Sequence, residues 1–261
     1  MPRTARRKSG TGMYHVVARG IGQQKIFHGD GDYLRYLELL KRTKEKSGCL
    51  IFGYCLMANH VHLLIKENEE DIGQVMKRLG TSYAKWHNWK HERFGHVFQD
   101  RYKSECIEDD KYLMAVIRYI HNNPVKAGIV TQPEKYKWSS CSNYYGGYTP
   151  FAGLIDIDFI RGFFSSDNRE AAEKFRQFME EKDDHLYLEY EWVKKVTDEE
   201  ISATISGLLE GRSINTLKQL KKAERDEIIK QVKGIEGTRL RQISKITGLG
   251  YSIIARAGDV S

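Results

Sequence analysis

Two histidines one residue apart are the first side chains in this sequence that could carry chemistry. His60 and His62 lie in the segment Met57-Ala-Asn-His-Val-His-Leu-Leu-Ile65. On a β-strand, residues i and i+2 point to the same face of the sheet. Both imidazoles would therefore project together and could share one metal ion, because neutral histidine is the commonest metal ligand. Two ordinary surface histidines on an amphipathic strand would give the same pattern, and this motif alone is weak evidence.

A tyrosine and an asparagine four residues apart form the second candidate group. Tyr119 and Asn123 would share one face of a helix. A tyrosine hydroxyl can attack phosphorus and form a covalent intermediate, and the Asn123 amide oxygen can act as a third metal ligand. A phenol with a pKa near 10 needs help at neutral pH, which a divalent ion on the phosphate supplies. Packing of Tyr119 against a sheet is the alternative, and Tyr112 is a second-choice nucleophile.

The elements that must position these residues follow the order β-α-β-β-α-β-α. Strands are expected over residues 13–18, 50–57, 60–66 and 102–107, and helices over 33–46, 72–90 and 110–122. Pro124 is expected to end the last helix and to leave Asn123 at its mouth. The predicted fold class is α+β, a ferredoxin-like (RRM-like) antiparallel sheet with packed helices over residues 1–150.

The rest of the chain is expected to be helical. Residues 151–195 are predicted as a helical connector and residues 196–261 as a small all-α domain. The segment 242–256 has a helix-turn-helix pattern with Gly248 at the turn, which favours duplex DNA binding. The residues expected to face DNA are Arg241, Tyr251, Ser252 and Arg256. A helical tail used only for packing is the alternative.

Net charge and composition point toward a polyanionic partner. The formal net charge is +7, and a basic surplus of this size favours nucleic acid as a partner. The four cysteines form no C-x-x-C pair, so the sequence does not suggest a zinc knuckle. Plain solubility is the alternative explanation of the charge. We expect no membrane span, no signal peptide, and a cytoplasmic, nucleoid-associated protein.

Further DNA contacts are predicted on two segments. Lys85 and Trp89 interleave charge and aromaticity, which suits phosphate contact and base stacking. For Tyr83 and Trp86 of the same segment, core packing at helical spacing is the favoured alternative. Arg101 and Lys103 flank Tyr102 on a predicted strand, so both would reach phosphates from one face. A solvated strand face is the alternative for that pair.

Four segments together resemble a known family. They are Met57-Ala-Asn-His-Val-His-Leu-Leu-Ile65, Gly95-His-Val-Phe-Gln-Asp-Arg-Tyr-Lys-Ser104, Tyr119-Ile-His-Asn-Asn-Pro-Val-Lys-Ala-Gly-Ile-Val130 and Trp138-Ser-Ser140. Over about residues 10–145 the chain resembles the single-tyrosine HUH transposases of small insertion sequences, most closely the REP-associated tyrosine transposase branch. It departs from that branch at Ala58, where members often carry proline.

The resemblance implies an HUH endonuclease fold and a chemistry. Such an enzyme binds single-stranded or hairpin-forming DNA, here of the repetitive extragenic palindrome type, as a monomer or homodimer. By resemblance, His60, His62 and Asn123 hold Mg²⁺ or Mn²⁺, and Tyr119 forms a 5′-phosphotyrosine and frees a 3′-OH. Two rivals stay open: a non-catalytic DNA-binding regulator using the helix-turn-helix, and an unrelated metal hydrolase.

Overall fold

The computed structural model describes residues 7–147, 151–181, 196–235, 238 and 240–257. The chain divides into two compact units, Met1–Glu189 and Tyr190–Ser261. Each unit has a hydrophobic core formed by its own residues, so each is described by itself. Among the described residues, no helix is long and apolar enough to cross a membrane.

The first unit is built on a four-stranded antiparallel sheet in the order β2-β3-β1-β4. The strands are β1 (Met13–Arg19), β2 (Leu50–Met57), β3 (His60–Lys66) and β4 (Lys103–Ile107). The central strands β3 and β1 are almost wholly buried, as expected for residues covered on both faces. The predicted α+β class with an antiparallel sheet and packed helices is therefore confirmed.

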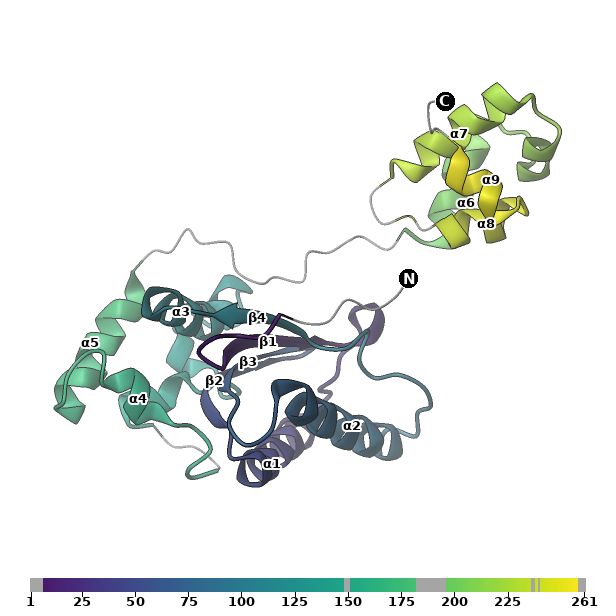
Figure 1. Cartoon of the computed structure of the whole chain (residues 1–261). Helices are drawn as coiled ribbons and strands as arrows, with labels where there is room; N and C mark the ends of the chain where they lie inside the picture. The colour runs from purple at the N-terminus through teal and green to yellow at the C-terminus, as the bar shows by residue number, and fades with distance from the viewer. Residues whose placement is uncertain (1–6, 148–150, 182–195, 236–237, 239, 258–261) are drawn as a thin grey trace. The chain divides into compact units, whose positions relative to one another are not determined.

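Helices cover both faces of this sheet. The pair α1 (Asp30–Ser47) and α2 (Ile72–Lys90) lies on one face, and α3 (Asp110–Lys126) lies on the other (Figure 1). The side chains of Asp71 and Asp109 accept hydrogen bonds from the first-turn N–H groups of α2 and α3, so both helices begin where a capping residue stands.

The end of α3 differs from the sequence prediction. Pro124 lies inside the helix and does not stop it, so Asn123 belongs to the last full turn of α3. The helix ends at Lys126, and Gly128 follows with a φ of +68°, the left-handed conformation that glycine adopts readily. There the Gly128 N–H bonds Val125 O and the Ile129 N–H bonds Pro124 O, which satisfies the final carbonyls. A buried proline near the end forfeits one helical hydrogen bond, and the packed helix tolerates that loss.

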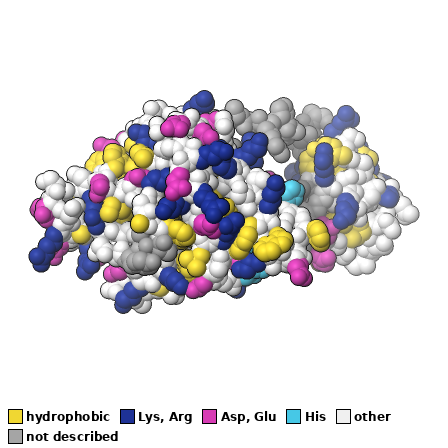
Figure 2. All heavy atoms as spheres, turned by 90° about the horizontal axis from the view of Figure 1, so that it is seen from below, with side chains coloured by type: hydrophobic (Ala, Val, Ile, Leu, Met, Phe, Trp, Pro, Cys, Tyr) yellow, Lys and Arg dark blue, Asp and Glu magenta, His cyan; other side chains and the backbone are white. Residues whose placement is uncertain are grey.

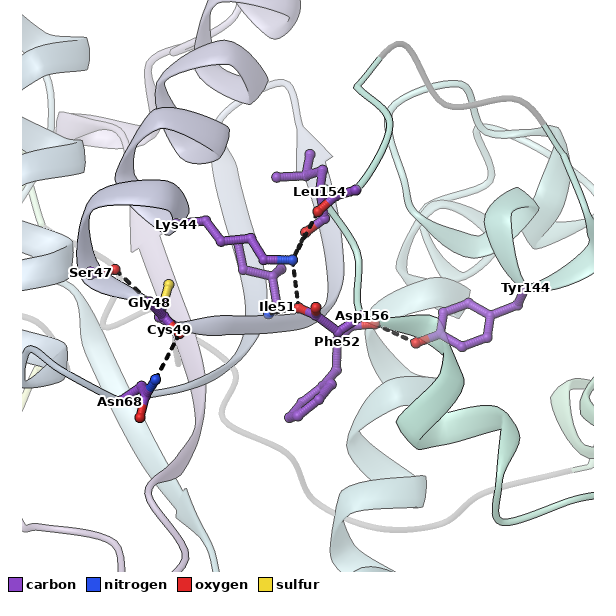
Figure 3. A network of polar contacts seen from close by, with 11 residues as sticks. Lys44, Ser47, Gly48, Cys49, Ile51, Phe52, Asn68, Tyr144, Leu154 and Asp156 are labelled. Carbon is purple, nitrogen blue, oxygen red and sulfur yellow. Dashed lines mark hydrogen bonds and ion pairs between the residues drawn. The ribbon is translucent and has the colours of Figure 1, made fainter. Parts of the chain in front are cut away.

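A well-bonded segment covers the outer edge of β2. Figure 3 shows Asp156 beside Ile51, where the Asp156 N–H bonds Ile51 O at 2.8 Å and its carboxylate accepts the Ile51 N–H at 2.8 Å. The Lys44 ammonium pairs with the same carboxylate at 2.7 Å. The Tyr144 hydroxyl donates to Phe52 O one step further along the strand. These bonds satisfy the backbone of an edge strand that would otherwise be open to pairing.

Residues 151–181, which we expected to connect two domains, pack on the first unit. They form α4 (Ile157–Arg161) and α5 (Asn168–Glu180). Arg118 and Asn122 of α3 donate to the carbonyls of Phe178 and Met179 at 3.3 and 3.2 Å. The Phe175 ring stacks on Tyr144 with centroids 4.5 Å apart. Three short 3-10 helices, η1 (Ile21–Gln23), η2 (Pro133–Lys135) and η3 (Cys141–Tyr145), complete this unit.

The second unit is wholly helical in its described part. Its elements are α6 (Asp198–Leu208), η4 (Ile214–Lys218), α7 (Lys222–Lys233), α8 (Leu240–Thr247) and α9 (Tyr251–Arg256). Thr197 and Glu200 form a reciprocal capping box at the start of α6. Gly248, with a φ of +63°, makes the short turn between α8 and α9. The C-terminal helical region expected from the sequence is therefore present.

Candidate active site

His60 and His62 lie side by side on the face of β3 that α3 covers. Their ring centroids are 4.9 Å apart. The Nδ1 atom of His60 is 2.7 Å from the Asn59 side-chain oxygen, and the Nδ1 atom of His62 is 3.0 Å from Nε2 of His15. One nitrogen of each ring is thus already engaged, which fixes the ring orientation.

Helix α3 brings Tyr119 and Asn123 to these imidazoles within the same chain. The Tyr119 ring centroid is 5.6 Å from that of His62 and 5.8 Å from that of His15, with edge-on geometry in both pairs. The Asn123 side chain hydrogen-bonds His60. A phenol, two imidazoles and an amide therefore converge at one place. The outermost of these residues, His60 and Asn123, are more than fifty residues apart in the chain.

The imidazoles of this site are held neutral. Burial, followed by the nearby Arg19 cation, lowers the pKa of His60 to about 4, although the bond from Asn123 acts in the opposite direction. Burial, with His60 next in importance, lowers the pKa of His62 well below its usual value. A neutral ring keeps the lone pair that a metal ligand needs. At neutral pH both side chains are consequently in the protonation state that can coordinate a cation.

Three residues that the sequence analysis did not single out line this site. His15 is fully buried beside His62 and stacks on it with a centroid distance of 5.3 Å. Arg19 pairs with His60 across β1 and β3, so both side chains emerge on the same face. Lys126 places its Nζ 4.8 Å from the centroid of the Tyr119 ring. The only signal in the sequence was that His15 and Arg19 are an even number of residues apart on one predicted strand, which puts both side chains on the same face.

The alternative nucleophile, Tyr112, has a different environment. It is half-buried on α3, close to the Glu105 carboxylate. Burial and then this carboxylate raise the pKa of the Tyr112 hydroxyl strongly. An adjacent negative charge opposes formation of a phenolate. The surroundings therefore favour Tyr119 over Tyr112 as a nucleophile.

The predicted DNA contacts of the first unit are divided between two faces. Lys103 of β4 pairs with Val17 of β1, which in turn pairs with His62 of β3. The Lys103 side chain therefore lies on the α3 face of the sheet, and it is exposed. Arg101 was expected on the same strand, but β4 begins at Lys103 and Arg101 precedes it in a bend. The prediction that a strand places both side chains on one face is therefore wrong.

Lys85 and Trp89 lie on α2, on the opposite face of the sheet from the imidazoles (Figure 1). Both are exposed, with 77% of Trp89 accessible to solvent. Figure 2 shows this side of the molecule, where Lys and Arg side chains are spread among acidic and hydrophobic ones. Lys85 and Trp89 consequently do not join the group around Tyr119.

The residues predicted to face DNA in the second unit are all exposed, namely Arg241, Tyr251, Ser252 and Arg256. Ile243 of α8 and Ile254 of α9 are buried, as the predicted helix-turn-helix pattern requires. Two short helices joined by a tight turn thus present these two arginines to solvent, together with the exposed side chains of Tyr251 and Ile253.

Comparison with known proteins agrees with the family suggested by the sequence. Residues 9–123 match the family model described as "Transposase IS200 like". Over 121 residues the chain is 27% identical to a REP-associated tyrosine transposase of Haemophilus influenzae, an alignment that covers 42% of this chain and 69% of the relative. A solved structure, described as a REP-associated tyrosine transposase bound to a REP hairpin, is similar with a TM-score of 0.47 and 18% identity. That similarity covers 60% of this chain and 90% of the other.

Proposed function

Residues 9–123 match the family of IS200-like transposases, and from this premise we propose a function. We propose that this chain cleaves and rejoins single-stranded or hairpin DNA through Tyr119. The reaction class would be strand transfer with a 5′-phosphotyrosine intermediate, of the single-tyrosine HUH type. The observation that carries the proposal is the meeting of Tyr119, Asn123, His60 and His62 on one face of the sheet.

The chemical step assigned to Tyr119 is an in-line displacement. Its phenolic oxygen would attack the phosphorus of a backbone phosphate, the new O–P bond would form, and the P–O3′ bond would break. The phenol loses its proton and the departing 3′ oxygen gains one, so the reverse step restores the original bond without an energy source. The Lys126 ammonium, 4.8 Å from the Tyr119 ring centroid, would offset the negative charge on the attacking oxygen.

His60, His62 and Asn123 are the residues that would hold a divalent ion such as Mg²⁺ or Mn²⁺. Two neutral imidazole nitrogens and one amide oxygen form an acceptable donor set, which leaves further positions for water and phosphate oxygens. When bound, such an ion supplies Lewis-acid polarisation of the scissile phosphate. His15 and Asn59, through their contacts at Nδ1, would keep the Nε2 atoms aimed at the ion.

The DNA partner is assigned from charge and exposure. Lys103, on the same face as His62, would contact a phosphate near the reacting one. Arg241, Tyr251 and Arg256 on the exposed side of α8 and α9 would bind the duplex stem of a hairpin. The relative described as REP-associated makes a repetitive extragenic palindrome the first substrate to test. All four side chains of the proposed constellation come from one chain, so a monomer suffices for it.

The decisive experiment traps the covalent intermediate. The full chain is incubated with hairpin oligonucleotides that carry single-stranded flanks, in the presence of Mn²⁺. We expect a slowed DNA band that protease abolishes. Tyr119→Phe should reduce its formation by at least about 1,000-fold, whereas the matched variant Tyr112→Phe should keep it.

Normal adduct formation by Tyr119→Phe would reject the assigned nucleophile. Tight hairpin binding that survives chelation, with no cleavage of any substrate, would instead support the non-catalytic regulator. Hydrolysis of a small phosphoester without a trapped intermediate would point to a metal hydrolase.

A further inference from the structure

A cluster of three histidines lies away from the site described above. His28 precedes α1, while His87 and His91 are one turn apart at the end of α2. Their ring centroids are separated by 4.6 Å for His28 and His91, 4.5 Å for His87 and His91, and 5.5 Å for His28 and His87. One ring nitrogen from each residue lies within 4.8 Å of the others. Three imidazoles therefore face a common point.

His87 is the least explained member of this cluster. Its side chain is fully buried, and neither ring nitrogen has a hydrogen-bond partner among the described residues. An orphaned buried polar group is costly, by about 1–3 kcal/mol. A cation bound between the three imidazoles would give one His87 nitrogen a partner.

A buried carboxylate already supports the cluster from outside. Asp32 is 0% exposed, and its oxygens lie 3.2 Å from Nε2 of His91. The same carboxylate accepts the backbone N–H of His28 at 2.6 Å and pairs with the Lys90 ammonium at 2.5 Å. This contact engages Nε2 of His91 and leaves its Nδ1 free to ligate. A metal-ligating histidine commonly donates its other ring N–H to a carboxylate, which fixes the orientation of the ring.

We propose that His28, His87 and His91 form a second metal site, which takes a late first-row divalent ion of the Zn²⁺ class and in which Asp32 orients His91. Three imidazole ligands, with no oxygen ligand from the protein, favour Zn²⁺, Ni²⁺ or Cu²⁺ over Mg²⁺. His28 is exposed to solvent, so a fourth position would be open to water, as in sites with three protein ligands. The end of α2 also favours a cation, because the helix dipole is negative there.

The geometry requires only a small closure. Nitrogens bound tetrahedrally at about 2.0–2.1 Å lie about 3.4 Å apart, so the three ligand atoms must approach by at most about 1.4 Å from the observed 4.8 Å. Rotation of the exposed His28 side chain would supply part of this movement. The cluster belongs to the α1 and α2 side of the sheet, whereas His60 and His62 face α3 (Figure 1). This second site is therefore independent of the proposed function.

The site would join segments that are far apart in the sequence. The backbone N–H groups of Ile26 and Phe27, just before His28, bond the carbonyl of Ala58 in the β2–β3 turn. An ion held by His28 and by His87 and His91 would tie this segment to the end of α2. A bound cation is thus expected to stabilise the first unit, because a ligand that binds only the folded state raises its stability.

The test measures metal binding by the full chain, prepared without a polyhistidine tag and stripped by chelation. A His60→Ala/His62→Ala background removes the first site and makes the two proposals separable. In that background we expect one Zn²⁺ per chain by equilibrium dialysis, a raised thermal midpoint, and a tetrahedral absorption spectrum with Co²⁺. Millimolar Mg²⁺ should not compete.

Variants of the cluster decide the outcome. His28→Ala changes an exposed residue, so folding should survive, and we expect Zn²⁺ affinity to fall by at least about 100-fold. Asp32→Asn should weaken it by about 10–100-fold. His96→Ala, which alters another exposed histidine, serves as the matched control and should bind normally. Absence of Zn²⁺ binding in the background chain, or equal binding by His28→Ala and His96→Ala, overturns the proposal.

Discussion

At the residue scale, the candidate site depends on how each imidazole is held. Either His15 or His62 must donate the hydrogen in their 3.0 Å contact. For Nε2 of His62 to accept a cation, its Nδ1 has to carry the hydrogen and donate it to His15. His15 is then a positioning residue, because it selects the tautomer in which His62 can act as a ligand.

A substitution of His15 tests this role. His15→Phe keeps the volume but removes the acceptor, and we expect Mn²⁺ affinity at the first site to weaken by about 10–100-fold. His15→Gln retains a polar atom that can accept, so it should restore part of the affinity. Calorimetric titration measures both, with the thermal midpoint of the metal-free chain as a check on folding. If His15→Phe binds Mn²⁺ like the unmodified chain, the positioning role is wrong.

At the element scale, the distance between α3 and the sheet decides where Tyr119 sits. A Cβ built on Gly53 of β2 would lie 2.5 Å from Cδ1 of Ile117, a fully buried side chain of α3. The absence of a side chain at this position lets the helix approach β2 closely. Any residue larger than glycine here must displace the Ile117 side chain, and so disturb the packing of α3 that holds Tyr119 beside His62.

Gly53→Ala is therefore expected to lower the free energy of unfolding by about 1–3 kcal/mol through overpacking. It should also reduce adduct formation. Gly80→Ala in α2 is the matched control, because its added Cβ meets only Phe98 at 4.0 Å. As a glycine replaced within a helix, it should be neutral or stabilising by about 0.5–1 kcal/mol. Urea unfolding of the two variants tests the difference, and equal losses of stability would contradict the argument.

At the scale of the whole molecule, the two units are built as separate hydrophobic cores. The core of the first unit extends to Met179 on α5, and the core of the second begins at Val196. Helices α4 and α5 are required by the first unit, since they cover α3 and the edge of β2. A fragment that stops at residue 150 would expose these apolar surfaces, whereas one that includes α5 would not.

A fragment of residues 1–189 should consequently fold and retain adduct formation with the hairpin substrate. Its affinity for the duplex stem should fall by at least about 10-fold, because the exposed arginines of α8 and α9 are removed. Circular dichroism, the adduct assay and a filter-binding titration measure the three properties. A fragment of residues 1–150 provides the comparison and should aggregate. Unchanged duplex affinity in the longer fragment would reject DNA binding by the second unit.

The sequence by itself determined the local elements and the side on which their residues emerge. The bounds of β2, β3 and α2 agree with prediction, and the alternation of β3 placed His60 and His62 together. These properties follow from hydrophobic period and capping, which act over a few residues. The resemblance to IS200-like transposases was also accessible, because the motifs that carry it are short and ordered along the chain.

Only the tertiary structure decided which distant residues meet. It placed His15 beside His62 through the pairing of β1 with β3, and it put α3 on the face that carries the imidazoles. It kept Pro124 within α3 and brought His28 to His87 and His91. Each of these outcomes depends on strand order and on helices packed across the sheet. Contacts between segments tens of residues apart leave no periodic trace in the sequence.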